Sequence, residues 1–237
     1  MEHLKNSGRK GVSLSEYLRA YAVSPADTSH LIALTFDDGF DNFDRLALPV
    51  LVQHGFTATV FVVTGYVGNN CTWDKMQGIP DLKLMDWRQV HECHTQGIEI
   101  GSHTIDHPHL THLNHLSIEK QVVESKEKLE HLLNTEGISF CYPYGEYDEN
   151  VMNQVQKAGY RAAVTSRFEY DRSRMNRYEL PRLGMNRIHP TDHEAQKLHF
   201  QAVFGGMLPF YHHLKETASS PHFSRGVRRR RIKIPLH

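Results

Sequence analysis

The sequence predicts an α/β fold built on a parallel sheet, and three observations lead to that prediction. Short apolar segments rich in β-branched and aromatic residues alternate with amphipathic segments of helical period. Glycine, proline and asparagine separate many of these segments, as expected for short connecting turns. Reactive side chains directly follow the apolar segments, which is typical of the carboxyl end of a parallel sheet. Periodicity alone leaves open whether the sheet forms a βα barrel or a doubly wound open sheet.

The first half of the chain supplies three of the predicted strands. Each is a short run of buried-type residues: 31–36, 56–63 and 98–102. The predicted helices around them have an apolar face and a recognisable end: about 12–18, 46–52 and 86–96. Ser13 or Ser15 caps the first helix, and Gly55 and Gly97 end the other two. Trp73, in the predicted loop 65–83, either lines the rim of a substrate site or packs in a small hydrophobic cluster beside the main core.

The second half continues the alternation of strands and helices. Its predicted strands are 138–141, 160–165 and, with a weaker pattern, 180–185. A long charged helix runs from Ser117 to about Asn134 with apolar residues on one face. Asp148 caps a further helix, which Gly159 ends. Short connections between such elements favour right-handed crossovers and a parallel sheet.

Composition is that of an ordinary globular protein, with 39% hydrophobic and 23% charged residues among 237. Lys+Arg and Asp+Glu balance at 27 each, so net charge indicates neither a nucleic-acid partner nor a membrane surface. The sequence contains no apolar run of about 18 residues, and its first ten residues have no signal-peptide core. The three cysteines are not closely spaced and predict no disulfide framework. These features favour a protein without a transmembrane segment that is either cytoplasmic or exported by a signal absent from this chain.

Two adjacent carboxylates follow the strand 31–36. Successive side chains of a strand point in opposite directions, so Asp37 and Asp38 should diverge. One carboxylate can then bind a cation while the other accepts a proton. Gly39 allows the chain to turn sharply just beyond them.

Two histidines, His103 and His107, follow the strand 98–102. Two imidazoles and a distant carboxylate are typical ligands of a divalent metal that keeps open positions for water or substrate. Pro108 argues against a continuous helix through the pair. Three further histidines at a spacing of three residues are predicted to be surface loop residues: His109, His112 and His115.

Three segments together resemble the polysaccharide deacetylases, the NodB-homology or carbohydrate esterase family 4 group. They are Thr35-Phe-Asp-Asp-Gly39, Ser102-His-Thr-Ile-Asp-His107 and Tyr142-Pro-Tyr-Gly145, in the order of that family's first three motifs. The resemblance covers about residues 31–187 and implies a distorted, incomplete (β/α) barrel. We accordingly expect a lead-in (1–30) packed on the barrel, a deacetylase domain (31–215) and a basic, disordered tail (216–237). The tail contains the run Arg228 to Arg231.

The resemblance also implies roles for individual residues. Asp38, His103 and His107 would bind a divalent ion, with zinc expected and cobalt, nickel or iron as alternatives. Asp37 would be the general base, and the backbone N–H at Tyr144 would donate to the oxyanion of the tetrahedral intermediate.

The sequence departs from the family pattern in two places. Cys141 stands where the family has an arginine that orients the catalytic aspartate. We read Cys141 as a small buried apolar residue, and Arg182 either substitutes for that arginine or forms a surface ion pair. His189 is a candidate for protonating the leaving amine, because the family's C-terminal Leu-x-His motif has no clear copy. Otherwise the acid belongs to a segment before residue 1 or is absent.

The resemblance favours a metal-dependent hydrolase of carbon–nitrogen, non-peptide bonds that removes N-acetyl groups from amino sugars of a polysaccharide or its precursor. The alternatives are an amidohydrolase acting on a small amide or cyclic imide, and a weakly active carbohydrate-binding relative without a general acid. A serine hydrolase and a phosphate-loop enzyme lack their G-x-S-x-G and P-loop motifs. The expected partner is a polysaccharide or oligosaccharide and not a nucleic acid, and the sequence does not determine the oligomeric state.

Overall fold

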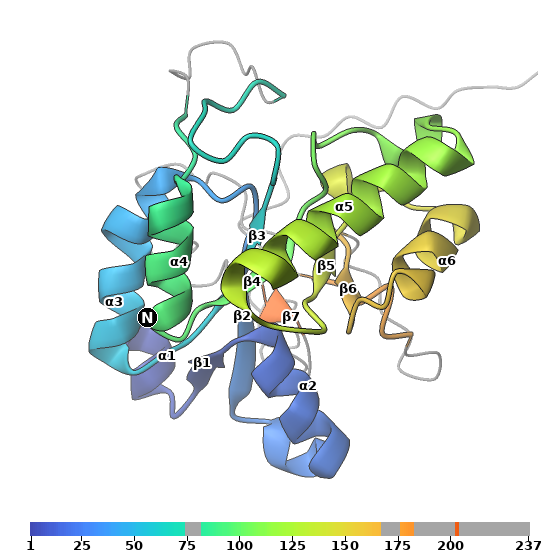
Figure 1. Cartoon of the computed structure of the whole chain (residues 1–237). Coiled ribbons are helices and arrows are strands. Elements are labelled where there is room, and N and C mark those ends of the chain that lie inside the picture. Colours follow the sequence, from blue (N-terminus) through green and yellow to red (C-terminus); the bar gives the residue numbers. More distant parts are fainter. Residues whose placement is uncertain (74–81, 167–175, 183–201, 204–237) are drawn as a thin grey trace, which may run out of the picture. The chain divides into compact units, whose positions relative to one another are not determined.

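The computed structural model describes residues 1–73, 82–166, 176–182 and 202–203. All of them belong to one compact unit, Met1–Gly205. Its sheet has the strand order β1-β2-β3-β4-β5-β6, with every neighbouring pair parallel, and β7 is antiparallel to β2 (Figure 1). The strands are β1 (Lys10–Val12), β2 (Leu31–Phe36), β3 (Thr59–Val62), β4 (Glu99–Ser102), β5 (Phe140–Cys141), β6 (Ala163–Val164) and β7 (Ala202–Val203). The described strands form a curved sheet that does not close, which confirms the predicted distorted, incomplete barrel.

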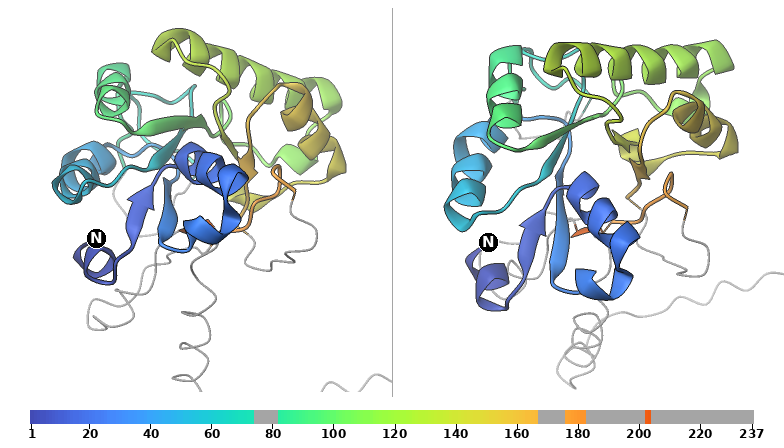
Figure 2. Two further views of the ribbon diagram at one scale, coloured as in Figure 1. Left: turned by 90° about the horizontal axis from the view of Figure 1, so that it is seen from below. Right: turned by 60° about the horizontal axis from the view of Figure 1, so that its bottom comes forward.

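Six α-helices accompany the sheet among the described residues: α1 (Glu2–Asn6), α2 (Leu14–Val23), α3 (Leu48–His54), α4 (Trp87–Thr95), α5 (His115–Leu133) and α6 (Glu149–Lys157). Short turns of other helical types are η1 (Pro25–Thr28), η2 (Phe43–Ala47), η3 (Leu110–His112) and η4 (Pro143–Gly145). Helices α3 and α4 lie together on one flank of the sheet, and α5 and α6 lie together on another (Figures 1 and 2). None of the described helices is long and apolar enough to cross a membrane.

Local sequence signals explain where most helices begin and end. Ser13 and Asp86 each accept a hydrogen bond from the third residue of the following helix, in complete capping boxes at α2 and α4. Gly55 ends α3 in the left-handed conformation, with φ at 67°. Helix α5 begins two residues before the predicted Ser117, because the side chain of Asn114 accepts from the Ser117 N–H and caps the helix earlier.

The sheet differs from the prediction at its ends. Strands β1 and β7 were not predicted, because three and two residues are too few to show a period. Strand β1 pairs with the first half of β2, with Gly11 opposite Ile32. Gly11 has no room for a side chain, because a Cβ there would lie 2.5 Å from Leu34 Cδ1. The predicted strands 138–141 and 160–165 are shorter than expected. Of the predicted strand 180–185, Leu180 forms a parallel bridge with Val164, and residues 183–185 lie outside the described part.

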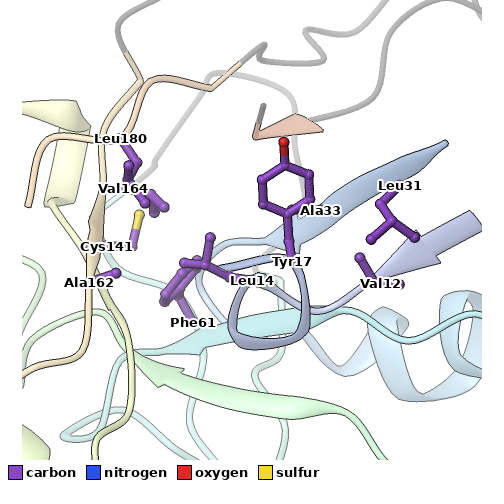
Figure 3. Packing of buried hydrophobic residues seen from close by; sticks show 10 residues of the cluster. All are labelled: Val12, Leu14, Tyr17, Leu31, Ala33, Phe61, Cys141, Ala162, Val164 and Leu180. Carbon is purple, nitrogen blue, oxygen red and sulfur yellow. The ribbon is translucent and has the colours of Figure 1, made fainter. Parts of the chain in front are cut away.

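Helix α2 fills the interior of the curved sheet at the end where the strands begin. Seen from below, it lies in the middle of the strands (Figure 2, left). Its Leu14 and Tyr17 are buried among inward-facing side chains of the strands, as Figure 3 shows. The cluster comprises Val12, Leu14, Tyr17, Leu31, Ala33, Phe61, Cys141, Ala162, Val164 and Leu180. This apolar layer closes the bottom of the sheet and leaves the opposite end, where the strands finish, for polar residues.

One carboxylate connects α2 to strands β3 and β4 and to the residue that precedes β5. Glu99 of β4 accepts hydrogen bonds from the backbone N–H of Ser15 at 2.8 Å and from its hydroxyl at 2.9 Å. The hydroxyls of Thr59 on β3 and Ser139 before β5 donate to the same carboxylate, at 3.0 and 2.9 Å. Because the N–H of Ser15 lies in the first turn of α2, the negative charge also complements the helix dipole.

Candidate metal centre

The two adjacent carboxylates diverge at the end of β2. Asp38 and Gly39 both have positive φ, at 69° and 73°, so the backbone turns at the second carboxylate itself. Asp38 Oδ1 lies 3.7 Å from Nε2 of His103 and 3.5 Å from Nε2 of His107. Asp37 points to a different partner, Arg182. The structure therefore brings together the three predicted ligands, while the predicted base pairs with Arg182.

Both histidines are buried at the end of β4. The ring nitrogen Nδ1 of His103 lies 2.8 Å from the carbonyl oxygen of Cys141, the last residue of β5. A carbonyl oxygen only accepts, so Nδ1 carries a proton, and Nε2 is the ring nitrogen that faces Asp38. His107 adopts a φ of 55°, and its backbone N–H donates to the hydroxyl of Thr104 at 3.0 Å.

These residues fit a divalent metal ion. One donor atom from each of Asp38, His103 and His107 lies within 4.8 Å of the other two. Burial, with the charge of His103 as a smaller cause, lowers the pKa of His107 to about 3, so this imidazole is neutral and can act as a ligand. Two imidazole nitrogens and one carboxylate oxygen are a common donor set of catalytic zinc sites.

A second group, Asp37, His103 and Cys141, also has its donor atoms within 4.8 Å of one another. It is a poorer metal site because a guanidinium already occupies it. Arg182 lies 3.1 Å from the sulfur of Cys141 and 2.6 Å from Asp37. The positive charge of Arg182 would repel a cation placed there.

Arg182 is buried, with 2% of its surface exposed, and reaches Asp37 from the far end of the described chain. Its two terminal nitrogens donate to the two carboxylate oxygens of Asp37 at 2.6 and 2.7 Å. It also donates to the hydroxyl of Thr35 at 3.0 Å and to the carbonyl oxygen of Thr165 at 2.9 Å. The pair is therefore buried and not a surface ion pair, and the role of Arg182 as a substitute for the family arginine stays a prediction.

Arg182 determines the charge state of Asp37. Burial raises the pKa of Asp37, but the charge and hydrogen bonds of Arg182 outweigh it and hold the pKa below its ordinary value. His103 and Cys141 contribute in the same direction. Asp37 is therefore ionised at neutral pH, as a proton acceptor must be.

Cys141 is fully buried, and burial raises the pKa of its thiol well above the ordinary value. The thiol is therefore protonated at neutral pH, and a protonated buried thiol is not a nucleophile. This agrees with the reading of Cys141 as a small buried residue. Its short side chain allows the guanidinium of Arg182 to approach within 3.1 Å.

Tyr144 lies beside the predicted metal ligands on η4. It has a φ of 58°, and its ring centroid lies 4.6 Å from that of His107. The ring is 44% exposed and stacks at 4.0 Å on His109, whose Nδ1 lies 2.8 Å from a carboxylate oxygen of Glu146. The side chain of the residue whose backbone N–H is the predicted oxyanion donor is thus adjacent to the candidate metal ligand His107.

The remaining predicted site residues divide into three cases. His189 lies outside the described residues. His109 and His112 are exposed as predicted, but His115 is not a loop residue, because the cap at Asn114 makes it the first residue of α5. For Trp73 the sequence left two roles open, a substrate rim or packing beside the core, and in the structure its indole stacks on His107 with centroids 4.8 Å apart and planes 20° apart. A tryptophan in a loop was the only available signal, and a loop cannot be placed from its sequence.

Comparison with known proteins supports the motif analysis. Residues 25–163 match the family model of the polysaccharide deacetylases. A peptidoglycan-N-acetylglucosamine deacetylase of Bacillus cereus is 33% identical over 132 residues, which are 55% of this chain and 42% of that protein. A poly-β-1,6-N-acetyl-D-glucosamine N-deacetylase of Staphylococcus aureus is 23% identical over 189 residues, which are 76% of this chain and 62% of that protein. The chain spans about half the length of the first curated relatives it matches.

A solved structure shares the fold. The Streptococcus pyogenes deacetylase PplD, in complex with acetate, superimposes with a TM-score of 0.59 at 26% sequence identity. The match covers 69% of this chain and 68% of that chain.

Proposed function

Because the chain belongs to the polysaccharide deacetylase family, we propose that it is a metal-dependent hydrolase that removes N-acetyl groups from amino sugars of a polysaccharide. The observation that carries this proposal is the convergence of three ligand atoms next to a separate, ionised carboxylate. Asp38 Oδ1 lies 3.7 and 3.5 Å from the Nε2 atoms of His103 and His107, while Asp37 forms an ion pair with Arg182. A metal-dependent amide hydrolase uses both a metal ligand and a free base, and the adjacent residues Asp38 and Asp37 can provide them.

The residues have complementary chemical roles in the proposed reaction. A divalent ion held by Asp38, His103 and His107, for which we propose zinc, would act as a Lewis acid toward the amide carbonyl and acidify water. Asp37 accepts the proton of the water that attacks the carbonyl carbon, and its pKa below the ordinary value keeps it ionised for this purpose. Arg182 holds both oxygens of Asp37 and so orients the base.

Two further groups are needed, one to stabilise the tetrahedral intermediate and one to assist its collapse. The backbone N–H of Tyr144, on the turn η4 beside His107, is the proposed donor to the oxyanion. Expulsion of the amine needs a proton, and His189 is the candidate donor from the sequence alone. The reaction ends with free acetate and an amino sugar.

The substrate is proposed from the relatives. Two of them are named for the removal of acetyl groups from N-acetylglucosamine, one in peptidoglycan and one in a β-1,6-linked polymer. We propose that this chain acts on the same acetamido sugar unit within a polymer. No observation favours a small amide, a cyclic imide or a solely carbohydrate-binding role.

The test is acetate release from peptidoglycan, chitin oligomers and β-1,6-linked N-acetylglucosamine. We expect release from at least one polymer, loss of release after chelation, and its return with added zinc or cobalt. Asp38→Asn should bind metal weakly and release little acetate. Asp41→Asn is the matched control, because Asp41 follows the same strand but pairs with the exposed Arg45 at 3.0 Å. If the metal-loaded protein releases acetate from none of the three polymers, the proposal is contradicted.

A further inference from the structure

The two candidate histidine ligands are oriented in different ways. The Nδ1 atom of His103 is held by the carbonyl oxygen of Cys141 at 2.8 Å. The Nδ1 atom of His107 is buried and has no hydrogen-bond partner among the described residues. Metal-binding histidines almost always donate the second ring N–H to an acceptor, which fixes the orientation of the ring. A different contact must therefore orient His107.

Aromatic rings surround the imidazole of His107. The indole of Trp73 lies almost parallel to the imidazole, with centroids 4.8 Å apart and planes 20° apart. Tyr144 and His103 meet the imidazole edge to face, at 4.6 and 4.7 Å with angles of 69° and 75°. The indole is in turn supported by Tyr66, which contacts it edge to face at 5.2 Å.

We propose that Trp73 is a positioning residue that holds His107 in its metal-binding orientation, in place of the usual hydrogen bond. The inference rests on the proposed metal site, and it adds a residue that none of the three family motifs contains. The hydrogen bond from the His107 N–H to Thr104 fixes the backbone but leaves rotation about the side-chain bonds free. A flat indole against one face of the imidazole restricts that rotation, because a turned ring would lose the stacking contact.

Substitutions of Trp73 should weaken metal binding without involving any ligand atom. Removal of a group that orients a metal ligand typically costs about 10- to 100-fold in metal affinity. We expect a loss of this size in Trp73→Ala and Trp73→Leu, because neither side chain offers a ring to stack on. Trp73→Phe should stay within a few-fold of the wild-type affinity, because phenylalanine can still stack.

The experiment is a chelator competition with Zn²⁺ on the purified full chain, together with absorption spectra of the Co²⁺-loaded protein. Trp87→Phe is the matched control, because Trp87 is the other of the two tryptophans in the chain. Trp87 begins helix α4, and the ammonium of Lys128 lies 4.9 Å from the centre of its ring. We expect this control to bind Zn²⁺ as the wild type does. Thermal unfolding of the metal-free forms shows whether each variant folds.

A double substitution separates positioning from a general packing effect. If Trp73 acts through His107, then Trp73→Leu should add little to the affinity already lost in His107→Ala. Equal Zn²⁺ affinity in Trp73→Leu, Trp73→Phe and wild type would overturn the proposal, and so would full additivity of the two substitutions. The metal site itself fails only if the wild-type protein binds no divalent ion, so the two failures can be told apart.

Discussion

Replacing Arg182 by methionine tests how the charge of Asp37 is held inside the fold. The substitution keeps a long apolar stem but removes the guanidinium that donates to both oxygens of Asp37, at 2.6 and 2.7 Å. It also removes the donors to Thr35 and Thr165. Asp37 is then left as a carboxylate without its counter-charge in a mostly buried position.

The expected cost follows from the burial of the pair. Breaking a buried ion pair by removing one partner typically lowers the free energy of unfolding by about 3–5 kcal/mol. The side chain of Asp37 is 23% exposed, so water partly solvates the remaining charge, and we expect a loss at the low end, about 3 kcal/mol. Urea unfolding at pH 7 measures it. Arg182→Lys should lie between wild type and Arg182→Met, because one ammonium cannot match two oxygens.

The pH dependence has a definite sign. Arg182 holds the pKa of Asp37 below its ordinary value, so the pair stabilises the fold above the unfolded pKa and loses this contribution as pH falls through the folded pKa. Without Arg182, burial raises the pKa of Asp37. The stability gap between wild type and Arg182→Met should therefore narrow below about pH 4. The acid limb of kcat/KM should move to higher pH in the variant. Equal stability at pH 7 together with an unmoved acid limb would refute this account of Arg182.

Three further predictions concern the base, the acid and the fold. Asp37→Asn should retain Zn²⁺ binding but lose about 10²-fold or more of the acetate-release rate, since it removes general base catalysis; a near-normal rate would place the base elsewhere. His189→Ala should lower the rate of amide hydrolysis by about 10²- to 10⁴-fold and leave the hydrolysis of aryl acetates unchanged, because their leaving groups need no proton. Unchanged rates on both kinds of substrate would exclude His189 as the acid. Glu99→Gln should lower the free energy of unfolding by about 1–3 kcal/mol, because an amide N–H would face hydroxyl and N–H donors, and Zn²⁺ affinity should not change.

The sequence by itself determined the parallel α/β class and the ends of the strands that carry reactive residues. Strand β2 is a continuous apolar run followed by Asp37 and Asp38. Their divergence was predicted from strand geometry, whereas in the structure β2 ends at Phe36 and the chain turns at Asp38, which has a φ of 69°. Helix ends at Asp86 and Gly55 follow from capping chemistry that involves residues only a few positions apart. All of these signals are local, which is why they can be read without the tertiary structure.

Only the tertiary structure decided which distant groups surround those residues. Arg182 reaches Asp37 across 145 positions of sequence, and it occupies the space left by the short side chain of Cys141. Trp73 comes from a loop without a motif and stacks on His107. A sequence pattern records local periodicity and spacing, whereas these contacts depend on how strands and loops pack in three dimensions. The motif residues were thus predictable from sequence. Arg182 was only one of two alternatives there, and the contact between Trp73 and His107 was not predicted.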